Sequence, residues 1–305
     1  MLEVYASRRV VRVGAVPQGN YRGLIEAPMI NCTILDLSAI DNTTFDVVAA
    51  DLQYDLSSDW ERFLADCALR GVAVYHTKHL MESLTGMVAL ERLSENSFGM
   101  LSPVSIFMTI KHIIDWVVAL VFLLFTFPFL VMIGIAIRID SPGSAIFRQK
   151  RIGYQGRTFT VYKFRTMTVA SADGHAKSDL ESAKTQSGDQ RITRFGAFLR
   201  RTRIDELPQV LNILRGEMSW IGPRPEAKVL SEWYASEIPF YHYRHIVRPG
   251  LTGWAQVNQG HVAEISDVQY KLYYDFYYIK NYSLWMDVVI IARTVITVIT
   301  GMGAK

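Results

Sequence analysis

The sequence has little cysteine, and this scarcity limits what can hold the fold together. Its 305 residues include only Cys32 and Cys67, which lie far apart and without a partner motif. We therefore expect neither a disulfide framework nor a zinc site, and a reducing cytosolic setting fits best. The first residues, MLEVYASRRVV, lack the apolar core that follows the basic head of a secretory signal, so we expect no cleaved signal peptide.

The net charge of +3 is also small, but it is unevenly distributed. Residues 1–100 carry 8 Lys and Arg against 13 Asp and Glu, a net charge of −5, whereas residues 101–305 carry 24 against 16, a net charge of +8. We expect the second part to contact phosphates or an anionic membrane surface. Half of the residues are hydrophobic and the mean hydropathy is +0.14. These values are high for a freely soluble protein and indicate a membrane element.

Residues 31–99 alternate short apolar segments with one amphipathic helix. The segments NCTILDLS, FDVVAADL and VAVYHT are predicted strands, and SSDWERFLADCALRG is a capped helix that ends at Gly71. This βαβ rhythm predicts the α/β fold class and a partial Rossmann-like module over residues 1–100. The segment contains no G-x-G-x-x-G loop, so nucleotide binding has no support here and a structural or regulatory role is favoured.

Residues 116–137, WVVALVFLLFTFPFLVMIGIAI, contain no charged residue and are long enough to cross a bilayer as a helix. Pro128 in the middle removes a backbone hydrogen bond and bends a helix. The basic residues that flank the segment are Lys111 before it and Arg138, Arg148, Lys150 and Arg151 after it. Because both flanks are basic, the positive-inside rule does not choose an orientation. A re-entrant helix and a spanning helix stay open on this pattern, with a buried helix of a soluble protein as the third interpretation.

The most informative stretch is RRTRIDELPQVLNIL, residues 200–214. Apolar residues at helical spacing predict an amphipathic helix over 206–215 that ends at Gly216, with Asp205 as its N-cap and Pro208 in its first turn. Capping alone would explain Asp205. The neighbouring arginines also make this helix N-terminus an anion site, and we expect them to keep Asp205 ionised.

Further cationic residues indicate a phosphate site. The strand FTVYKFRTM, residues 159–167, places Lys163 and Arg165 on one face, and Arg224 lies between two prolines that would fix its backbone. Arg248 opens the glycine-rich segment RPGLTGWAQVNQG. An arginine-rich pocket compatible with Mg²⁺ beside a membrane helix indicates phosphoryl transfer between a soluble diphosphate and a lipid phosphate.

Four ordered motifs over about residues 108–304 resemble the bacterial sugar transferases, the monotopic phosphoglycosyl transferases that act on undecaprenyl phosphate. They are KFRTM, GDQRITRFGAFLRRTRIDELPQVLNILRGEMSWIGPRPE, RPGLTGWAQVNQG and YDFYYIKNYSLWMDVVIIARTV. The resemblance implies a membrane-associated α/β transferase domain over residues 108–305, with 116–137 as a re-entrant helix. Residues 1–100 resemble the end of a module in longer, hexose-1-phosphate-transferring members that also carry N-terminal transmembrane helices. The sugar therefore stays open.

The implied reaction transfers a sugar 1-phosphate from a UDP-sugar to undecaprenyl phosphate and releases UMP, at the cytoplasmic face of the bacterial inner membrane. It would initiate exopolysaccharide, capsule or O-antigen synthesis. Asp205 and Glu206 match the catalytic dyad of the family. We expect Asp205 to form an aspartyl-phosphosugar and Glu206 to hold Mg²⁺. The expected phosphate-binding residues are Lys163, Arg165, Arg203, Arg224 and Arg248.

Two alternatives to this reaction remain. One is a membrane glycosyltransferase that releases UDP, and the other is a non-catalytic membrane scaffold that binds nucleotide-sugar. We expect no nucleic-acid partner, and the sequence leaves a homo-oligomer open. Residues 284–302 are apolar but interrupted by Asp287 and Arg293, which predicts a helix on the protein or bilayer surface instead of a second span.

Overall fold

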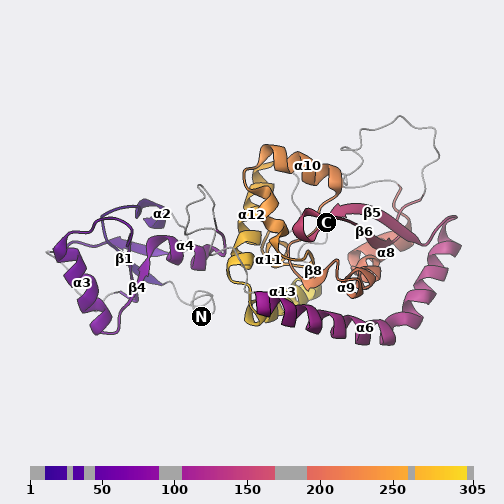
Figure 1. Cartoon of the computed structure of the whole chain (residues 1–305), viewed down its shortest axis with the longest axis horizontal. Coiled ribbons are helices and arrows are strands. Elements are labelled where there is room, and N and C mark those ends of the chain that lie inside the picture. The colour runs from indigo at the N-terminus through magenta and orange to yellow at the C-terminus, as the bar shows by residue number, and fades with distance from the viewer. Residues whose placement is uncertain are drawn as a thin grey trace. The chain divides into compact units, whose positions relative to one another are not determined.

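The computed structural model describes residues 11–25, 30–37, 45–88, 105–168, 191–259 and 265–300. The chain divides into two compact units, residues 1–88 and 89–305 (Figure 1). Both units mix helices and strands, which confirms the α/β class. The polar, Ser-, Ala- and Lys-rich sequence of residues 168–187 predicts a loop, and this segment lies outside the described residues from residue 169 onward.

Unit 1 contains a four-stranded parallel sheet in the order β2-β1-β3-β4. Its elements are β1 (Arg12–Ala15), α2 (Arg22–Ile25), β2 (Asn31–Ile34), β3 (Val47–Ala50), α3 (Ser58–Leu69), β4 (Ala73–His76) and α4 (Thr77–Thr85). The predicted strands and the predicted helix before Gly71 are present, whereas β1, α2 and α4 were not predicted. The interpretation as a partial Rossmann-like module stays a prediction.

The central strand β3 is buried on both faces of the sheet, which explains why it is an uninterrupted apolar run. Trp60 and Leu64 of α3 pack with Val48 on one face. Leu24 of α2 and Leu80 of α4 pack on the other face. The unit therefore has two small hydrophobic layers, one on each side of the sheet.

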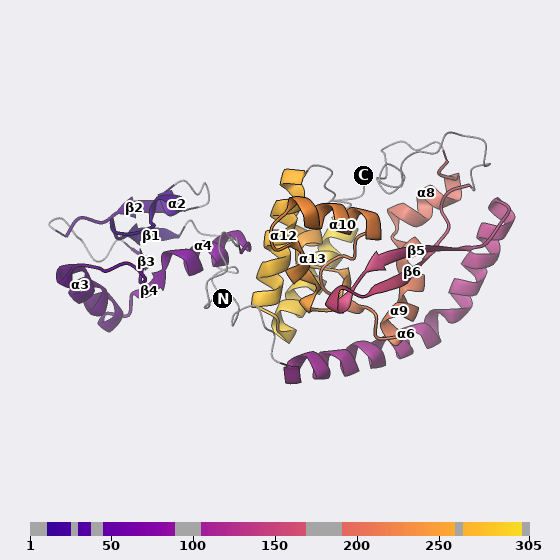
Figure 2. The ribbon, with the colours of Figure 1, turned by 45° about the horizontal axis from the view of Figure 1, so that its top comes forward.

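The second unit begins with α6 (Ser105–Asp140), a helix of 36 residues. It is the one helix in the described part of the chain that is long and apolar enough to cross a membrane. The helix runs beneath the rest of the unit and then turns towards the β5–β6 hairpin (Figures 1 and 2). Pro128 lies inside it, and Thr126 Oγ1 donates to the carbonyl of Phe122 at 2.7 Å. Both features bend helices.

One stripe of α6 faces the unit and the rest is exposed. Lys111, Asp115 and Ala119 are buried at four-residue spacing, while large apolar side chains are exposed along most of the helix. An exposed apolar surface of this length requires a membrane or another cover. The structure thus supports membrane association, and the re-entrant path stays a prediction.

Above α6 lie an antiparallel hairpin, β5 (Ile146–Ile152) and β6 (Thr158–Phe164), followed by α8 (Arg194–Arg201), the 3₁₀ helix η2 (Ile204–Gln209) and α9 (Val210–Leu214). The short 3₁₀ turn η1 (Tyr154–Gly156) joins the two strands. Phe159 and Val161 of β6 pack with Val210 and Ile213 against Ala119 of α6. This core fixes η2 beside β6.

The remaining elements complete the unit: β7 (Ser219–Ile221), α10 (Lys228–Glu237), the 3₁₀ helix η3 (Tyr241–Ile246), β8 (Gly250–Thr252), α11 (Trp254–Asn258), α12 (Ile265–Lys280) and α13 (Leu284–Thr300). Strands β7 and β8 pair in parallel. Their backbones pack closely, since a Cβ on Gly250 would lie 2.1 Å from Gly222 N and one on Gly253 would lie 2.2 Å from Gly222 O. Glycine is therefore required where the backbones of β7 and β8 lie against each other.

Candidate active site

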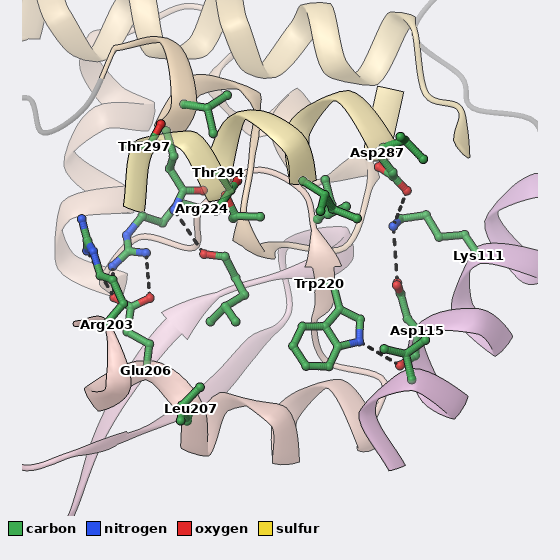
Figure 3. A pocket seen from close by; sticks show the side chains of 18 of the residues that line it. Lys111, Asp115, Arg203, Glu206, Leu207, Trp220, Arg224, Asp287, Thr294 and Thr297 are labelled. Atoms are coloured by element: carbon green, nitrogen blue, oxygen red, sulfur yellow. Dashed lines mark hydrogen bonds and ion pairs between the residues drawn. The ribbon is translucent and has the colours of Figure 1, made fainter. Parts of the chain in front are cut away.

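Glu206 of η2 lies at the centre of a cluster of cations. Arg224 donates from Nη2 to Glu206 Oε1 at 2.6 Å and from Nη1 to Oε2 at 3.2 Å. Lys163 Nζ of β6 donates to Oε1 at 3.1 Å, and Arg203 Nη1 lies 3.8 Å from the same oxygen. The close-up in Figure 3 shows Arg203 and Arg224 converging on Glu206. The fold therefore brings three of the five predicted phosphate-binding residues together around the dyad.

The ion pairs shift the pKa values of this cluster in opposite directions. Burial by itself raises the pKa of Glu206, but Arg224 and Lys163 outweigh burial and hold it well below its usual range. Burial lowers the pKa of Lys163 to about 8, and Glu206 opposes part of that change. Glu206 is thus a permanent anion, and Lys163 titrates near physiological pH.

Asp205 differs from its neighbour because none of the cations that the structure describes is paired with it. Its Oδ1 is buried and has no hydrogen-bond partner among the described residues. Burial and then the Glu206 charge raise the pKa of Asp205, against the opposing effects of Lys163, Arg200 and Arg203. The cations near Asp205 therefore oppose the rise in its pKa without cancelling it, and the expectation that they keep Asp205 ionised stays a prediction.

The predicted capping role of Asp205 is wrong. The residue that precedes η2 is Arg203, which has left-handed backbone angles (φ 59°), and Asp205 lies inside the first turn. The predicted single helix over 206–215 is a 3₁₀ turn followed by α9. Asp205 is thus a buried carboxylate with a free acceptor beside a fully paired one. Adjacent carboxylates whose pKa values are pushed apart are typical of catalytic pairs.

A second layer of buried ions fixes the backbone that carries Arg224. Arg244 Nη2 donates to the carbonyl of Arg224 at 2.9 Å and its Nη1 donates to Tyr241 Oη at 2.7 Å. Arg244 also forms an ion pair of 2.7 Å with Asp275 of α12. Sequence reasoning missed these supporting residues. The available signal was the carboxylate in the tyrosine-rich segment YDFYY. A charge in such a segment is expected to be buried, and a buried charge requires a partner.

The next residues of the same turn are held in a similar way. Glu226 pairs with Lys271 of α12, and Arg151 of β5 donates to the carbonyl of Pro225. Burial by itself raises the pKa of Glu226, but Lys271, Arg244 and Arg151 lower it far below its usual range. The segment from Pro223 to Glu226 is therefore anchored from three elements, which fixes the guanidinium that binds Glu206.

A cavity of about 760 Å³ begins at the Glu206 cluster. Its wall comes from α6, η2, β7, β8, α11 and α13, and most of its lining is apolar. Figure 3 shows a second ionic group at the far end: Lys111 Nζ lies 2.7 Å from Asp287 Oδ2 and 3.6 Å from Asp115 Oδ2. Trp220 lies between the two groups (Figure 3). The cavity thus joins a cationic end to an apolar interior beside the membrane helix.

The structure places the other two predicted phosphate residues elsewhere. Arg165 Nη2 donates to the carbonyls of Ser141 at 2.5 Å and Ile137 at 3.3 Å, so it binds the C-terminal end of α6. Arg248 Nε donates to the carbonyl of Gly216 at 3.0 Å. Neither arginine lines the cavity. Their predicted role in binding substrate phosphate stays a prediction without a contact to this site.

The dyad has the donor chemistry for the predicted Mg²⁺. This ion prefers carboxylate oxygens together with phosphate oxygens and water. Asp205 Oδ1 is an unpartnered buried acceptor next to the anionic Glu206, so the residues fit the ion. The described residues contain no group of three or more His, Cys, Asp and Glu side chains that could hold a metal. Further ligands would have to come from substrate and water.

Fold and site together define a membrane-associated α/β enzyme whose cationic site suits phosphate-bearing substrates. The model of the family described as "Bacterial sugar transferase" matches residues 106–301, and the chain belongs to this family of transferases. The family assignment made from the four motifs is thereby confirmed.

Three relatives indicate the breadth of the match. A UDP-N-acetylgalactosamine-undecaprenyl-phosphate N-acetylgalactosaminephosphotransferase of Aeromonas hydrophila is 43% identical over 298 residues, 97% of this chain and 69% of the relative. A UDP-glucose:undecaprenyl-phosphate glucose-1-phosphate transferase of Xanthomonas campestris pv. campestris is 42% identical over 195 residues, 63% of this chain and 39% of the relative. An exopolysaccharide production protein, PSS, of Rhizobium leguminosarum bv. phaseoli is 39% identical over 198 residues, 63% of this chain and 96% of the relative.

Proposed function

We propose that this protein transfers a sugar 1-phosphate from a UDP-sugar to undecaprenyl phosphate and releases UMP. The reaction would take place at the cytoplasmic face of the bacterial inner membrane as the first step of polysaccharide assembly. The observation that carries the proposal is the buried, unpartnered Asp205 directly beside the ion-paired Glu206. Glu206 lies at the cationic end of the apolar cavity, whereas Asp205 itself does not line it. The names of the relatives supply the two substrates.

The chemistry follows from the two different carboxylates. Asp205 attacks the β-phosphorus of the UDP-sugar, a new P–O bond forms, and the bond from that phosphorus to the bridging oxygen breaks. UMP leaves with the electron pair of the broken bond. An oxygen of the lipid phosphate then attacks the aspartyl-phosphosugar, which returns Asp205 as a carboxylate and leaves the sugar on a lipid diphosphate. The raised pKa of Asp205 fits a more basic and hence stronger nucleophile.

The surrounding cations would neutralise the substrate. Lys163, Arg203 and Arg224 already converge on one carboxylate, and a diphosphate offers the same oxygen acceptors. Mg²⁺ held at Glu206 would add Lewis-acid neutralisation of the diphosphate. The protein supplies fixed donors in a water-poor site, where they act more strongly than in water.

The apolar cavity suits the lipid acceptor. Ile114 and Val118 of α6 line it on one side, and Val288 and Ile291 of α13 line it on the other. Its volume is that of a pocket for a drug-sized ligand. It would therefore enclose only the first isoprene units of the acceptor, and the rest of the chain would lie in the bilayer. A re-entrant α6 would keep both flanks of the helix at the cytoplasmic face.

The experiment that tests the proposal is a product and adduct assay. The full chain in membranes receives UDP-N-acetylgalactosamine or UDP-glucose, the donors in the names of the relatives, together with undecaprenyl phosphate. We expect UMP and not UDP as the soluble product. Without lipid acceptor, the peptide containing Asp205 should gain the mass of one sugar phosphate. Release of UDP would refute the phosphotransfer, and UMP release without any adduct would refute the covalent route.

A further inference from the structure

Three arginines, Arg148, Arg215 and Arg248, lie in a row beside α6, and we call them the arginine row. Arg148 belongs to β5, Arg215 follows α9, and Arg248 precedes β8. The row continues through Gly216, whose carbonyl accepts from Arg248 Nε at 3.0 Å. A Cβ on Gly216 would lie 3.2 Å from Cε1 of His112, which places this point against α6.

The arginine row and the cavity lie on different flanks of α6. A helix turns about 100° per residue. The buried stripe of α6 contains Lys111 and Asp115, and Ile114 on one side of this stripe lines the cavity. His112, which touches the row, lies on the other side of the stripe. None of the three arginines lines the cavity, so the row is separate from the site described above.

No ion pair among the described residues neutralises the positive charge of the row. None of the three has a carboxylate within ion-pair distance in the part of the chain that the structure describes. Glu217 acts on Arg215 from farther away, and its carboxylate accepts from Asn212 Nδ2 at 2.7 Å. Three guanidinium groups without paired carboxylates on one flank form a local cationic surface.

Tyrosine rings hold these guanidinium groups in place. Arg215 lies 4.9 Å and Arg148 lies 6.0 Å from the centre of the Tyr162 ring, and Arg248 lies 5.0 Å from that of Tyr154. Arg215 also donates to the Tyr162 hydroxyl. Stacking on a ring face orients a guanidinium and leaves its edge donors available for an anion.

One exposed apolar side chain accompanies the arginines: Leu211, 40% exposed, lies one helical turn before Arg215. Phe147 directly precedes Arg148 in β5, so their side chains lie on opposite faces of the hairpin. The exposed apolar face of α6 continues beside them. A soluble anion gains nothing from an exposed leucine and an exposed apolar helix, whereas a lipid surface offers apolar chains and charged headgroups together.

We propose that the arginine row binds the phosphate groups of anionic phospholipids in the leaflet that receives α6. The apolar neighbours would enter the acyl boundary, and the guanidinium edges would meet the phosphates at headgroup depth. This contact would fix the rotation of the domain about α6. The inference needs only membrane association and does not rest on the proposed reaction.

The test measures lipid retention by the full chain. Protein purified in neutral detergent is mixed with dioleoyl phosphatidylglycerol or dioleoyl phosphatidylcholine, and bound lipids are counted by native mass spectrometry. An R148Q/R215Q variant removes the two exposed members of the row. Arg248 is retained because it also holds the Gly216 carbonyl. R62Q/R70Q removes the same charge from exposed positions of α3 and its C-cap and serves as the matched control.

We expect wild-type protein and the R62Q/R70Q control to retain phosphatidylglycerol over phosphatidylcholine. Each arginine near an anionic surface contributes a factor of about five, so R148Q/R215Q should bind phosphatidylglycerol about 25-fold more weakly. R148K/R215K should keep most of the preference, since its charge is intact. Equal retention of both lipids by wild type, or unchanged selectivity in R148Q/R215Q with its fold verified by circular dichroism, would overturn the proposal.

Discussion

The two carboxylates of the dyad should respond in opposite ways when each is replaced by its amide. Glu206→Gln removes the anion that faces Arg224 at 2.6 Å and Lys163 at 3.1 Å, and it leaves two buried cations unpaired. Removing one partner of a buried ion pair costs about 3–5 kcal/mol. For a unit of this size, each kcal/mol corresponds to roughly 2–4 °C in Tm, so the transferase unit should lose roughly 6–20 °C.

Asp205→Asn should leave the stability unchanged or raise it at neutral pH. Asp205 has no ion pair among the described residues, and burial and Glu206 raise its pKa above the usual value. At pH values between the pKa of Asp205 in the unfolded chain and its higher pKa in the folded protein, the folded state binds more protons than the unfolded state. The ionised group therefore destabilises the fold above the folded pKa, and the fold regains stability as the pH falls through that pKa. The amide removes this penalty.

The assay is thermal unfolding of both variants in the same detergent at pH 7 and again at lower pH, combined with UMP release. We expect Asp205→Asn to abolish UMP release with a Tm at or above that of wild type. The Tm difference between this variant and wild type should shrink towards lower pH, because wild-type Asp205 becomes protonated. A loss of stability in Asp205→Asn as large as that in Glu206→Gln would refute this account, since it would require a hidden partner for Asp205.

Three further predictions concern a titration, a topology and a buried ion pair. Lys163, with a pKa of about 8, should give a basic limb in kcat/KM above that pH, and Lys163→Arg should remove the limb because arginine stays protonated. With the native cysteines replaced, single cysteines at Thr109 and Ser144 should react with a membrane-impermeant reagent from the same side, and labelling from opposite sides would exclude the re-entrant path. Asp287→Asn should lower the Tm because it strips Lys111 of its 2.7 Å partner. Lys111→Met should lower the Tm at least as much, because it leaves Asp115 and Asp287 buried without a cation; an unchanged Tm would contradict this account.

Local patterns were sufficient for part of this molecule. The strand that contains Lys163, the long apolar helix and the proximity of Arg203 and Arg224 to the dyad follow from short motifs and their chemistry. They could be predicted because periodicity and turn residues act over a few positions. The membership in the family also followed from motifs, since their order along the chain is itself specific.

Contacts between distant segments could not be predicted in this way. The predicted strand over residues 159–167 contains both Lys163 and Arg165, but β6 ends at Phe164 and Arg165 binds the end of α6 instead. No local pattern shows which carbonyls will lie beside Arg165. Lys111 and Asp287 are 176 positions apart and meet only because α13 packs on α6. The misassigned cap at Asp205 has a similar cause, because the backbone turns at Arg203 before the helix begins.

The close packing of the paired strands β7 and β8 has a consequence for how the glycine-rich segment should be interpreted. At Gly222, Gly250 and Gly253 even a methyl group would collide with backbone atoms, which cannot move aside as a side chain can. An alanine at any of them would displace the turn that presents Arg224, although a glycine has no side chain with which to act on the dyad. If these glycines never change among functional variants, the reason would be lack of space. A mutational screen for catalytic residues would then score them as essential although they take no part in the chemistry.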